Sequence, residues 1–293
     1  MERYWTKTHS FTDGAARFFD LCYFTLNQDD LAEEEVPHTV FCGFDQQLWY
    51  QYSHVNWTAV GIVFATQPDD KAVAISEDGN VWTYFSGKEK TESFKEKPRL
   101  IRNISVIEGE VYACGMDRQV YRRFGENNWR GMHAPKPGKG ETLGFEAIAG
   151  FSKNEIYAVG WDGEVWRAEK GDWQNCDSPV NAILTGVHCS NDGFVYVCGQ
   201  DGVILRGRRD TWEFIGDENV TDDLWDVVEF KGKIYFASKS DIYVLDNNKL
   251  EQIMPETDNI ETAGRFTSRE EVLWSIGDKD VFSFDGNTWT RVD

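Results

Sequence analysis

Short stretches of alternating apolar and polar residues recur along the chain and end in one local pattern. Each stretch runs into a small residue, then a polar turn that usually contains Asp, and then an aliphatic residue followed by an aromatic one. The segment from Ile156 to Trp166 shows the pattern most completely, with Gly160 as the small residue and Asp162-Gly163 in the turn. Alternation with a period of two residues is typical of β-strands. The pattern therefore predicts a chain built of strands.

Seven copies of this pattern are present, at a nearly regular spacing. Their small residues are Gly43, Ser76, Gly115, Gly160, Gly199, Ser238 and Gly277. Successive copies are 33, 39, 45, 39, 39 and 39 residues apart, with a mean of 39. A period near 40 residues with strand-type alternation is typical of four-stranded propeller blades. The sequence predicts an all-β fold, in which residues 1–293 form one seven-bladed β-propeller.

Each copy resolves into four strands. An apolar first strand lies upstream, as in Phe145–Ile148, and the second strand follows, as in Glu155–Val159. The Asp-Gly turn closes a hairpin, since these residues accept the positive φ of tight loops. The third strand carries the aliphatic-aromatic pair. A Trp marks the fourth strand in five copies, at Trp57, Trp129, Trp173, Trp212 and Trp289.

The two ends of the chain resemble each other. Arg3–Lys7 is similar to Asn287–Arg291, so both segments are predicted to be outermost strands of one blade. The N- and C-terminal strands would then close the ring by pairing, which removes an exposed sheet edge. In this arrangement Phe18–Phe24 is the innermost strand of the first blade.

The repeat also resembles a known family. Gly160-Trp-Asp-Gly-Glu-Val-Trp-Arg167, followed by Gly171-Asp-Trp173, is similar to the repeat of bacterial seven-bladed propellers of the broad BNR/YVTN-like kind. The resemblance covers nearly the whole chain and implies the fold, but propellers host enzymes, receptors and inhibitors alike. Ser76–Trp82 resembles the sialidase Asp box, but its Gly79 lies one position early, so sialidase activity is not inferred.

Charge narrows the classes of partner. The chain has 30 Lys and Arg against 50 Asp and Glu, a formal net charge of −20. Nucleic acids and anionic membranes are bound mainly through Lys and Arg, so we expect neither as a partner. Two interpretations of the acidity remain: it keeps the protein soluble, or it recognises a basic protein.

The N-terminal residues lack the features of a secretory signal, and the longest apolar run, Val60–Ala65, is far too short to span a bilayer. We therefore expect a cytoplasmic protein. Its six Cys show no Cys-x-x-Cys pair and three of them occupy one repeat position, which favours reduced, buried thiols.

Catalytic chemistry is sparse in the sequence. The five His are scattered without metal-ligand spacing, and no nucleophile motif, phosphate loop or dinucleotide fingerprint is present. We predict no catalytic residue, no metal and no cofactor. Arg122, Arg167 and Arg206 share one position in three copies; the interpretation as rim residues paired with carboxylates is favoured over an anion clamp.

The loops provide the candidate binding surface. Second-to-third-strand turns and blade connections open on one face of a propeller, around the channel mouth. Two groups of residues are predicted to bind a partner there, one at turn tips and one in an acidic arc of blade connections. They are Phe44, Glu77, Met116, Trp161, Gln200 and Asp278 at the tips, and Asp217, Glu218, Asp222, Asp223, Glu256, Asp258 and Glu261 in the arc. Local packing explains the apolar tips equally well.

Apolar anchors ringed by charge are typical of a protein-binding surface. The leading hypothesis is a non-enzymatic propeller that captures a basic protein, most concretely an immunity protein or inhibitor that neutralises a cytosolic toxin such as a nuclease. It would exist as a monomer or as a heterodimer with its partner. The alternatives are a scaffold with several partners and, third, a hydrolase or lyase acting on a glycan.

Overall fold

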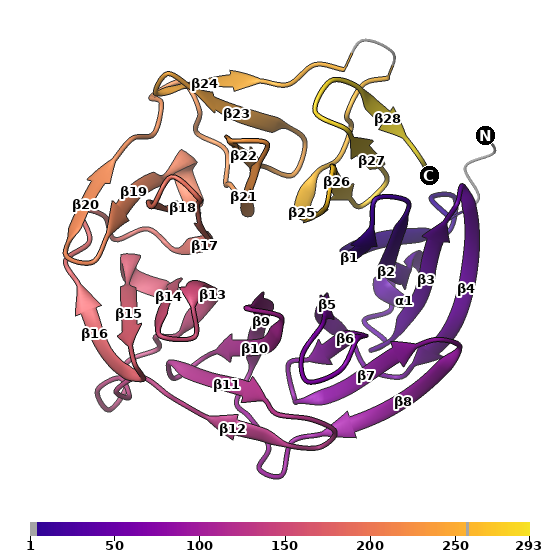
Figure 1. The fold of residues 1–293 in the computed structure, drawn as a ribbon, viewed down its shortest axis with the longest axis horizontal. Helices are drawn as coiled ribbons and strands as arrows, with labels where there is room; N and C mark the ends of the chain where they lie inside the picture. The colour runs from indigo at the N-terminus through magenta and orange to yellow at the C-terminus, as the bar shows by residue number, and fades with distance from the viewer. Residues whose placement is uncertain (1–4, 256–257) are drawn as a thin grey trace.

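The computed structural model describes residues 5–255 and 258–293, which form seven blades in a ring (Figure 1). A channel lies at the centre of the ring. Each blade is an antiparallel sheet of four strands that follow one another in the chain from the channel to the rim. The all-β, seven-bladed propeller predicted from the repeat is confirmed.

The first three blades hold twelve strands and the helix α1, which lies between β2 and β3. The elements are β1 (His9–Phe18), β2 (Leu21–Gln28), α1 (Asp29–Glu33), β3 (Thr39–Asp45), β4 (Leu48–Val55), β5 (Ala59–Ala65), β6 (Lys71–Ser76), β7 (Asn80–Phe85), β8 (Lys88–Ser93), β9 (Ile101–Ile107), β10 (Glu110–Gly115), β11 (Gln119–Arg123) and β12 (Trp129–Gly131). In the described part of the chain, no helix is long and apolar enough to cross a membrane.

The remaining four blades follow the same order. Their elements are β13 (Phe145–Ser152), β14 (Glu155–Gly160), β15 (Val165–Glu169), β16 (Asp172–Cys176), β17 (Leu184–Cys189), β18 (Val195–Gly199), β19 (Ile204–Arg208), β20 (Thr211–Phe214), β21 (Asp226–Phe230), β22 (Lys233–Ala237), β23 (Ile242–Asp246), β24 (Lys249–Gln252), β25 (Gly264–Arg269), β26 (Val272–Gly277), β27 (Val281–Phe284) and β28 (Trp289–Arg291).

Two faces follow from this topology. Because neighbouring strands are antiparallel, the second-to-third-strand turns and the blade-to-blade connections emerge on one side of the ring, which we call the connection face. The first-to-second and third-to-fourth-strand turns emerge on the other side, which we call the hairpin face. The first strand of every blade lines the channel.

The predicted Asp-Gly turns have the expected backbone. Asp162 and Gly163 have φ of 57° and 66°, and Asp201 and Gly202 have φ of 55° and 69°. A Cβ at Gly163 would also overlap the carbonyl oxygen of Val180 in the next blade connection. Glycine is therefore required here both for its positive φ and for the close approach of two loops.

The blades hold together by packing apolar faces against each other. Between the first two blades, the rings of Phe41 and Trp82 are stacked with centroids 3.9 Å apart. Six Trp are buried: Trp5, Trp82, Trp129, Trp166, Trp274 and Trp289. All six Cys are free, five of them buried and Cys189 partly exposed.

Ring closure differs from the prediction. The terminal strands do not share a sheet, because the first blade is β1–β4 and the last is β25–β28. The junction closes by packing instead: Trp5 and Val292 lie in one apolar cluster, and the Ala16 N–H donates to Thr267 Oγ1 at 3.0 Å. The predicted N-terminal strand lies partly in residues 1–4, outside the described residues, and its remainder forms a turn.

The register of the first blade was also predicted wrongly. The innermost strand is β1, and Phe18–Phe24 spans a hairpin turn and the start of β2. The motif at Cys42-Gly43 lies on the third strand, β3, whereas the other six copies lie on second strands or directly after them. The physical reason is that α1 and the residues up to His38 replace the tight second-to-third turn of this blade, so the pattern appears on β3 instead. Gly43 therefore lies one strand closer to the second blade, which accounts for the short first step of 33 residues.

Candidate functional site

The predicted acidic arc lies on the connection face. Asp217, Glu218, Asp222 and Asp223 belong to the connection between β20 and β21. Asp258 and Glu261 belong to the connection between β24 and β25, and Asp278 follows β26. Glu256 lies outside the described residues. The structure thus places these carboxylates on one side of the ring, over the fifth to seventh blades.

Some carboxylates of the arc hold its loops in shape. Asp217 Oδ1 accepts the Asn219 N–H at 2.9 Å and the Asn219 Nδ2 at 2.8 Å, and these hydrogen bonds lower the pKa of Asp217. Asp223 Oδ1 accepts the Asp201 N–H at 3.0 Å, which ties the blade connection to the neighbouring turn. These residues have a structural role whatever the loops bind.

Other carboxylates of the arc face solvent. The side chains of Glu218, Asp258, Glu261 and Asp278 are exposed and form no hydrogen bond or ion pair with any described residue. Unpaired carboxylates at loop tips attract cationic groups at long range. They are the members of the arc best placed to meet a partner.

The predicted apolar tips are mostly withdrawn from this surface. Phe44 was placed at a second-to-third turn, but it lies on β3, near the hairpin face, and is buried against Trp49 with ring centroids 5.0 Å apart. Met116 is at the predicted turn but only 8% exposed. Trp161 is half-buried and donates from Nε1 to Glu146 Oε1 at 2.6 Å.

Glu77 and Gln200 do lie at second-to-third turns of the connection face. Glu77 is exposed, and Gln200 is partly exposed at the start of a short 3-10 turn, Gln200–Gly202. Their role in binding remains a prediction. The most exposed apolar side chain on this face is Met254, which is 76% exposed between β24 and β25, beside the acidic arc. Val36 and Leu100 on the same face are exposed to a smaller extent.

Sequence reasoning missed an acidic segment in the first blade. Residues 29–35 read Asp-Asp-Leu-Ala-Glu-Glu-Glu and contain α1, on the connection face. Asp29 is paired with Lys279, with 2.7 Å between Oδ2 and Nζ, which ties α1 to the turn after Asp278. The exposed carboxylates that extend the arc are Asp30, Glu33, Glu34 and Glu35. The run of five carboxylates was visible in the sequence, but the shifted register of the first blade hid its location.

The arc and this segment form one surface, which we call the acidic half-ring. It covers the fifth, sixth, seventh and first blades on the connection face. It consists of Asp30, Glu33, Glu34, Glu35, Asp217, Glu218, Asp222, Asp223, Asp258, Glu261 and Asp278.

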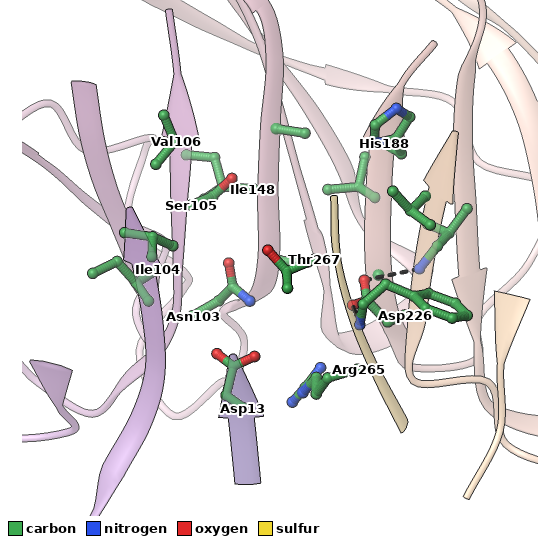
Figure 2. Close-up of a pocket in the computed structure, with 18 of the residues that line it drawn as sticks. Asp13, Asn103, Ile104, Ser105, Val106, Ile148, His188, Asp226, Arg265 and Thr267 are labelled. Atoms are coloured by element: carbon green, nitrogen blue, oxygen red, sulfur yellow. Dashed lines mark hydrogen bonds between the residues drawn. The ribbon is translucent and has the colours of Figure 1, made fainter. Parts of the chain in front are cut away.

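The central channel is the second candidate site. It encloses about 390 Å³ and is lined by residues of the seven first strands. Figure 2 shows Asp13, Asn103 and Arg265 around its lower part and His188 at the opposite end. Burial is the main cause that raises the pKa of Asp13 to about 6 and lowers the pKa of His188.

The channel carboxylates are already engaged by the main chain. Asp13 accepts the N–H groups of Gly14 and Ile62 at 2.8 Å each, so it joins the first blade to the second. Asp226 accepts the Phe266 N–H at 2.8 Å and joins the sixth blade to the seventh (Figure 2). Among the described residues, no group of three His, Cys, Asp or Glu could hold a metal ion. These carboxylates therefore join neighbouring blades.

The three equivalent arginines lie away from the channel, on third strands, and pair with acidic or amide side chains. Arg122 contacts Glu110 at 2.6 Å and Arg206 contacts Glu213 at 2.6 Å. Arg167 donates to Gln174 Oε1 at 3.0 Å and lies 3.7 Å from Glu169. The interpretation as rim pairs is confirmed, and the anion clamp is not formed.

Comparison with known proteins decides the family. The chain is 38% identical over 293 residues to the immune protein Tsi7 of Pseudomonas aeruginosa, and the match covers 96% of both chains. This chain belongs to the Tsi7 family. No family model matches the sequence.

Solved structures extend the fold of this Tsi7-family chain beyond its sequence relatives. Virginiamycin B lyase from Staphylococcus aureus superposes with a TM-score of 0.78 at 13% identity over 94% of each chain. Sqt1 from Saccharomyces cerevisiae superposes with a TM-score of 0.65 at 10% identity, covering 97% of this chain and 84% of its own. At such identities the likeness concerns the seven-bladed fold alone.

Proposed function

We propose that this protein is a non-enzymatic immunity protein that binds and neutralises a toxin with a basic surface, and that the toxin docks on the acidic half-ring. The relationship to the immune protein Tsi7 carries the first half of the proposal. The unpaired carboxylates of the half-ring support the second half, because they give one side of the molecule a surface complementary to a cationic protein.

Electrostatics and packing would have separate roles in such a complex. The unpaired carboxylates, with Glu218, Asp258 and Glu261 near the centre, would steer a basic toxin and raise the association rate. Charge alone gives limited affinity, so an apolar anchor is needed. Met254, at 76% exposure beside these carboxylates, is the most exposed apolar side chain for that role.

Purification of the tagged protein from the source cells at about 0.15 M salt, followed by mass spectrometry, tests the partner class. We expect one basic protein in stoichiometric amount, released when the salt is raised to about 1 M. Several substoichiometric proteins would favour the scaffold alternative. A clean negative would argue against stable capture and direct attention to glycan turnover at the channel.

Charge reversal tests the docking surface once the toxin is in hand. The triple variant Glu218→Lys/Asp258→Lys/Glu261→Lys should slow association with the toxin about tenfold or more. Its matched control is Asp172→Lys/Asp210→Lys/Glu251→Lys, which makes the same change in net charge at exposed rim positions. Equal slowing in both variants would show that overall charge, and not the half-ring, determines binding.

A second triple variant, Glu33→Lys/Glu34→Lys/Glu35→Lys, extends the test to the first blade. These residues follow each other at the end of α1 and have exposed side chains. We expect slower association here too, since the half-ring is continuous through Asp278 and Asp29. Unchanged association would limit the docking surface to the later blades.

A further inference from the structure

The cations of this acidic protein are unevenly distributed. Residues 88–170, which span the end of the second blade, the third blade and the first three strands of the fourth, contain 15 of the 30 Lys and Arg but only 13 of the 50 Asp and Glu. This stretch is therefore slightly positive, whereas the rest of the chain carries the whole acidic excess. A local reversal of sign on a protein with a net charge of −20 indicates a surface with a different ligand from the half-ring.

Four of these cations surround one groove. It lies at the boundary of the third and fourth blades, at the outer edge of the hairpin face, and has a volume of about 480 Å³. Arg122 and Arg130 line it from β11 and β12, and Lys153 and Lys170 line it from two turns of the fourth blade. No carboxylate lines the groove. We call it the cationic groove.

Three of the four cations lack an anionic partner. Arg122 is paired with Glu110 at 2.6 Å, but Arg130, Lys153 and Lys170 form no ion pair with any described residue. Glu108, the carboxylate next to Lys153, is engaged by that residue's main-chain N–H at 2.8 Å. Acidic residues outnumber basic ones in this protein, so three unpaired cations around one hollow are available to an external anion.

An exposed aromatic ring organises the two arginines. Phe124 is 37% exposed, and the guanidinium carbons of Arg122 and Arg130 lie 4.6 Å and 4.4 Å from its ring centre. Contact with the ring face restrains each guanidinium and leaves N–H edges for a carboxylate, whose geometry matches the guanidinium fork. An aromatic residue flanked by arginines is also typical of interaction hot spots.

We propose that the cationic groove binds an acidic peptide segment of a partner protein. A short segment with a few Asp or Glu side chains can place its carboxylates on Arg130, Lys153 and Lys170 without extending over the acidic remainder of the surface. A nucleic acid continues its charge along every phosphate and would meet the repulsion of a molecule with net charge −20. The groove thus gives the protein a second interaction surface, opposite in charge to the half-ring.

Fluorescence anisotropy with labelled hexaglutamate tests the proposal on the full-length protein. We expect saturable binding at about 0.05 M salt that weakens at about 0.15 M. The variant Lys153→Glu/Lys170→Glu should weaken this binding about tenfold or more. The matched control Lys88→Glu/Lys233→Glu makes the same charge change at exposed, unpaired lysines of the second and sixth blades and should retain most of the binding.

Three outcomes would overturn the proposal. They are no binding of hexaglutamate by the wild type, equal loss in the groove variant and the control, and tighter binding of a short oligothymidylate than of hexaglutamate. Far-ultraviolet circular dichroism and thermal unfolding of each variant establish that the fold is kept. The milder variant Arg130→Gln, at an exposed side chain, should still reduce binding severalfold, so a folding defect in the double variant does not end the test.

Discussion

Arg123 and Glu92 form a bidentate ion pair that is completely buried between the second and third blades. Arg123 Nη2 lies 2.7 Å from Glu92 Oε1, Arg123 Nε lies 3.0 Å from Glu92 Oε2, and both side chains are 0% exposed. Glu92 comes from β8 and Arg123 from β11, so the pair joins the outer strand of one blade to the next blade. A charge at this depth is tolerated because its partner satisfies it.

Removing one partner should therefore destabilise the protein strongly. In Glu92→Gln the guanidinium of Arg123 stays buried without its carboxylate, and only the half-exposed Asp69, at 3.5 Å, remains near it. We expect the free energy of unfolding to fall by about 3–5 kcal/mol. Urea unfolding followed by Trp fluorescence measures the change.

An exposed pair between the same two blades provides the control. Lys90 and Glu126 lie 2.6 Å apart, with both side chains about half exposed. Glu126→Gln should lower the free energy of unfolding far less than Glu92→Gln does, because solvent screens the pair. If both variants lost similar amounts of unfolding free energy, the buried Arg123–Glu92 pair would not hold the two blades together more strongly than the exposed pair does.

Gly163 should be the most sensitive of the turn glycines in the fourth blade. In Gly163→Ala the new Cβ meets the carbonyl of Val180, and the residue keeps a φ of 66° that alanine disfavours. We expect a loss of about 1–3 kcal/mol from backbone strain, with the overlap adding to it. The comparison is Gly87→Ala, where φ is 80° but no atom lies within 4 Å. Equal losses at both glycines would show that the close approach of the two loops contributes nothing.

The regular blades could be predicted from the sequence because their signals are local. The residue types in Asp162-Gly163 and Asp201-Gly202 predict their positive φ. The constant step of 39 residues follows from equal loop lengths. The first blade could not be aligned in this way. The pattern of an apolar strand, a small residue and a polar turn occurs at Cys42-Gly43 on a third strand as well as at the ends of second strands. In the first blade α1 replaces the turn after the second strand, so the pattern alone assigned the wrong register.

The candidate sites, too, could be predicted only where the sequence signal is local. The acidic arc was predictable because blade connections reach the connection face in every propeller. The burial of Phe44 depends on the contact between the first and last blades, which no local pattern records. The cationic groove depends on how Arg130 of one blade meets Lys153 and Lys170 of the next. Its charge was visible as a basic stretch in the sequence, but its shape arises only when the blades pack.

Asp13 should make stability depend on pH between about 4 and 7. Burial in the channel raises its pKa from 3.8 to about 6, so the folded protein holds this proton more tightly than the unfolded chain does. The resulting stabilisation is fully present below pH 3.8 and is lost as the pH rises through about 6. A shift of this size corresponds to about 3 kcal/mol, and it would be larger without Arg265, whose charge favours the ionised form.

The variant Asp13→Asn removes this titration while keeping a side-chain oxygen for one of the two main-chain N–H groups. The wild type's advantage in free energy of unfolding over this variant should shrink by about 2 kcal/mol from pH 4 to pH 7. Urea unfolding at several pH values measures it. Asp210→Asn, which removes an exposed carboxylate outside the channel, supplies the comparison. Parallel pH profiles of wild type and Asp13→Asn would mean that Asp13 is ionised across this range, and that its main-chain hydrogen bonds outweigh its burial.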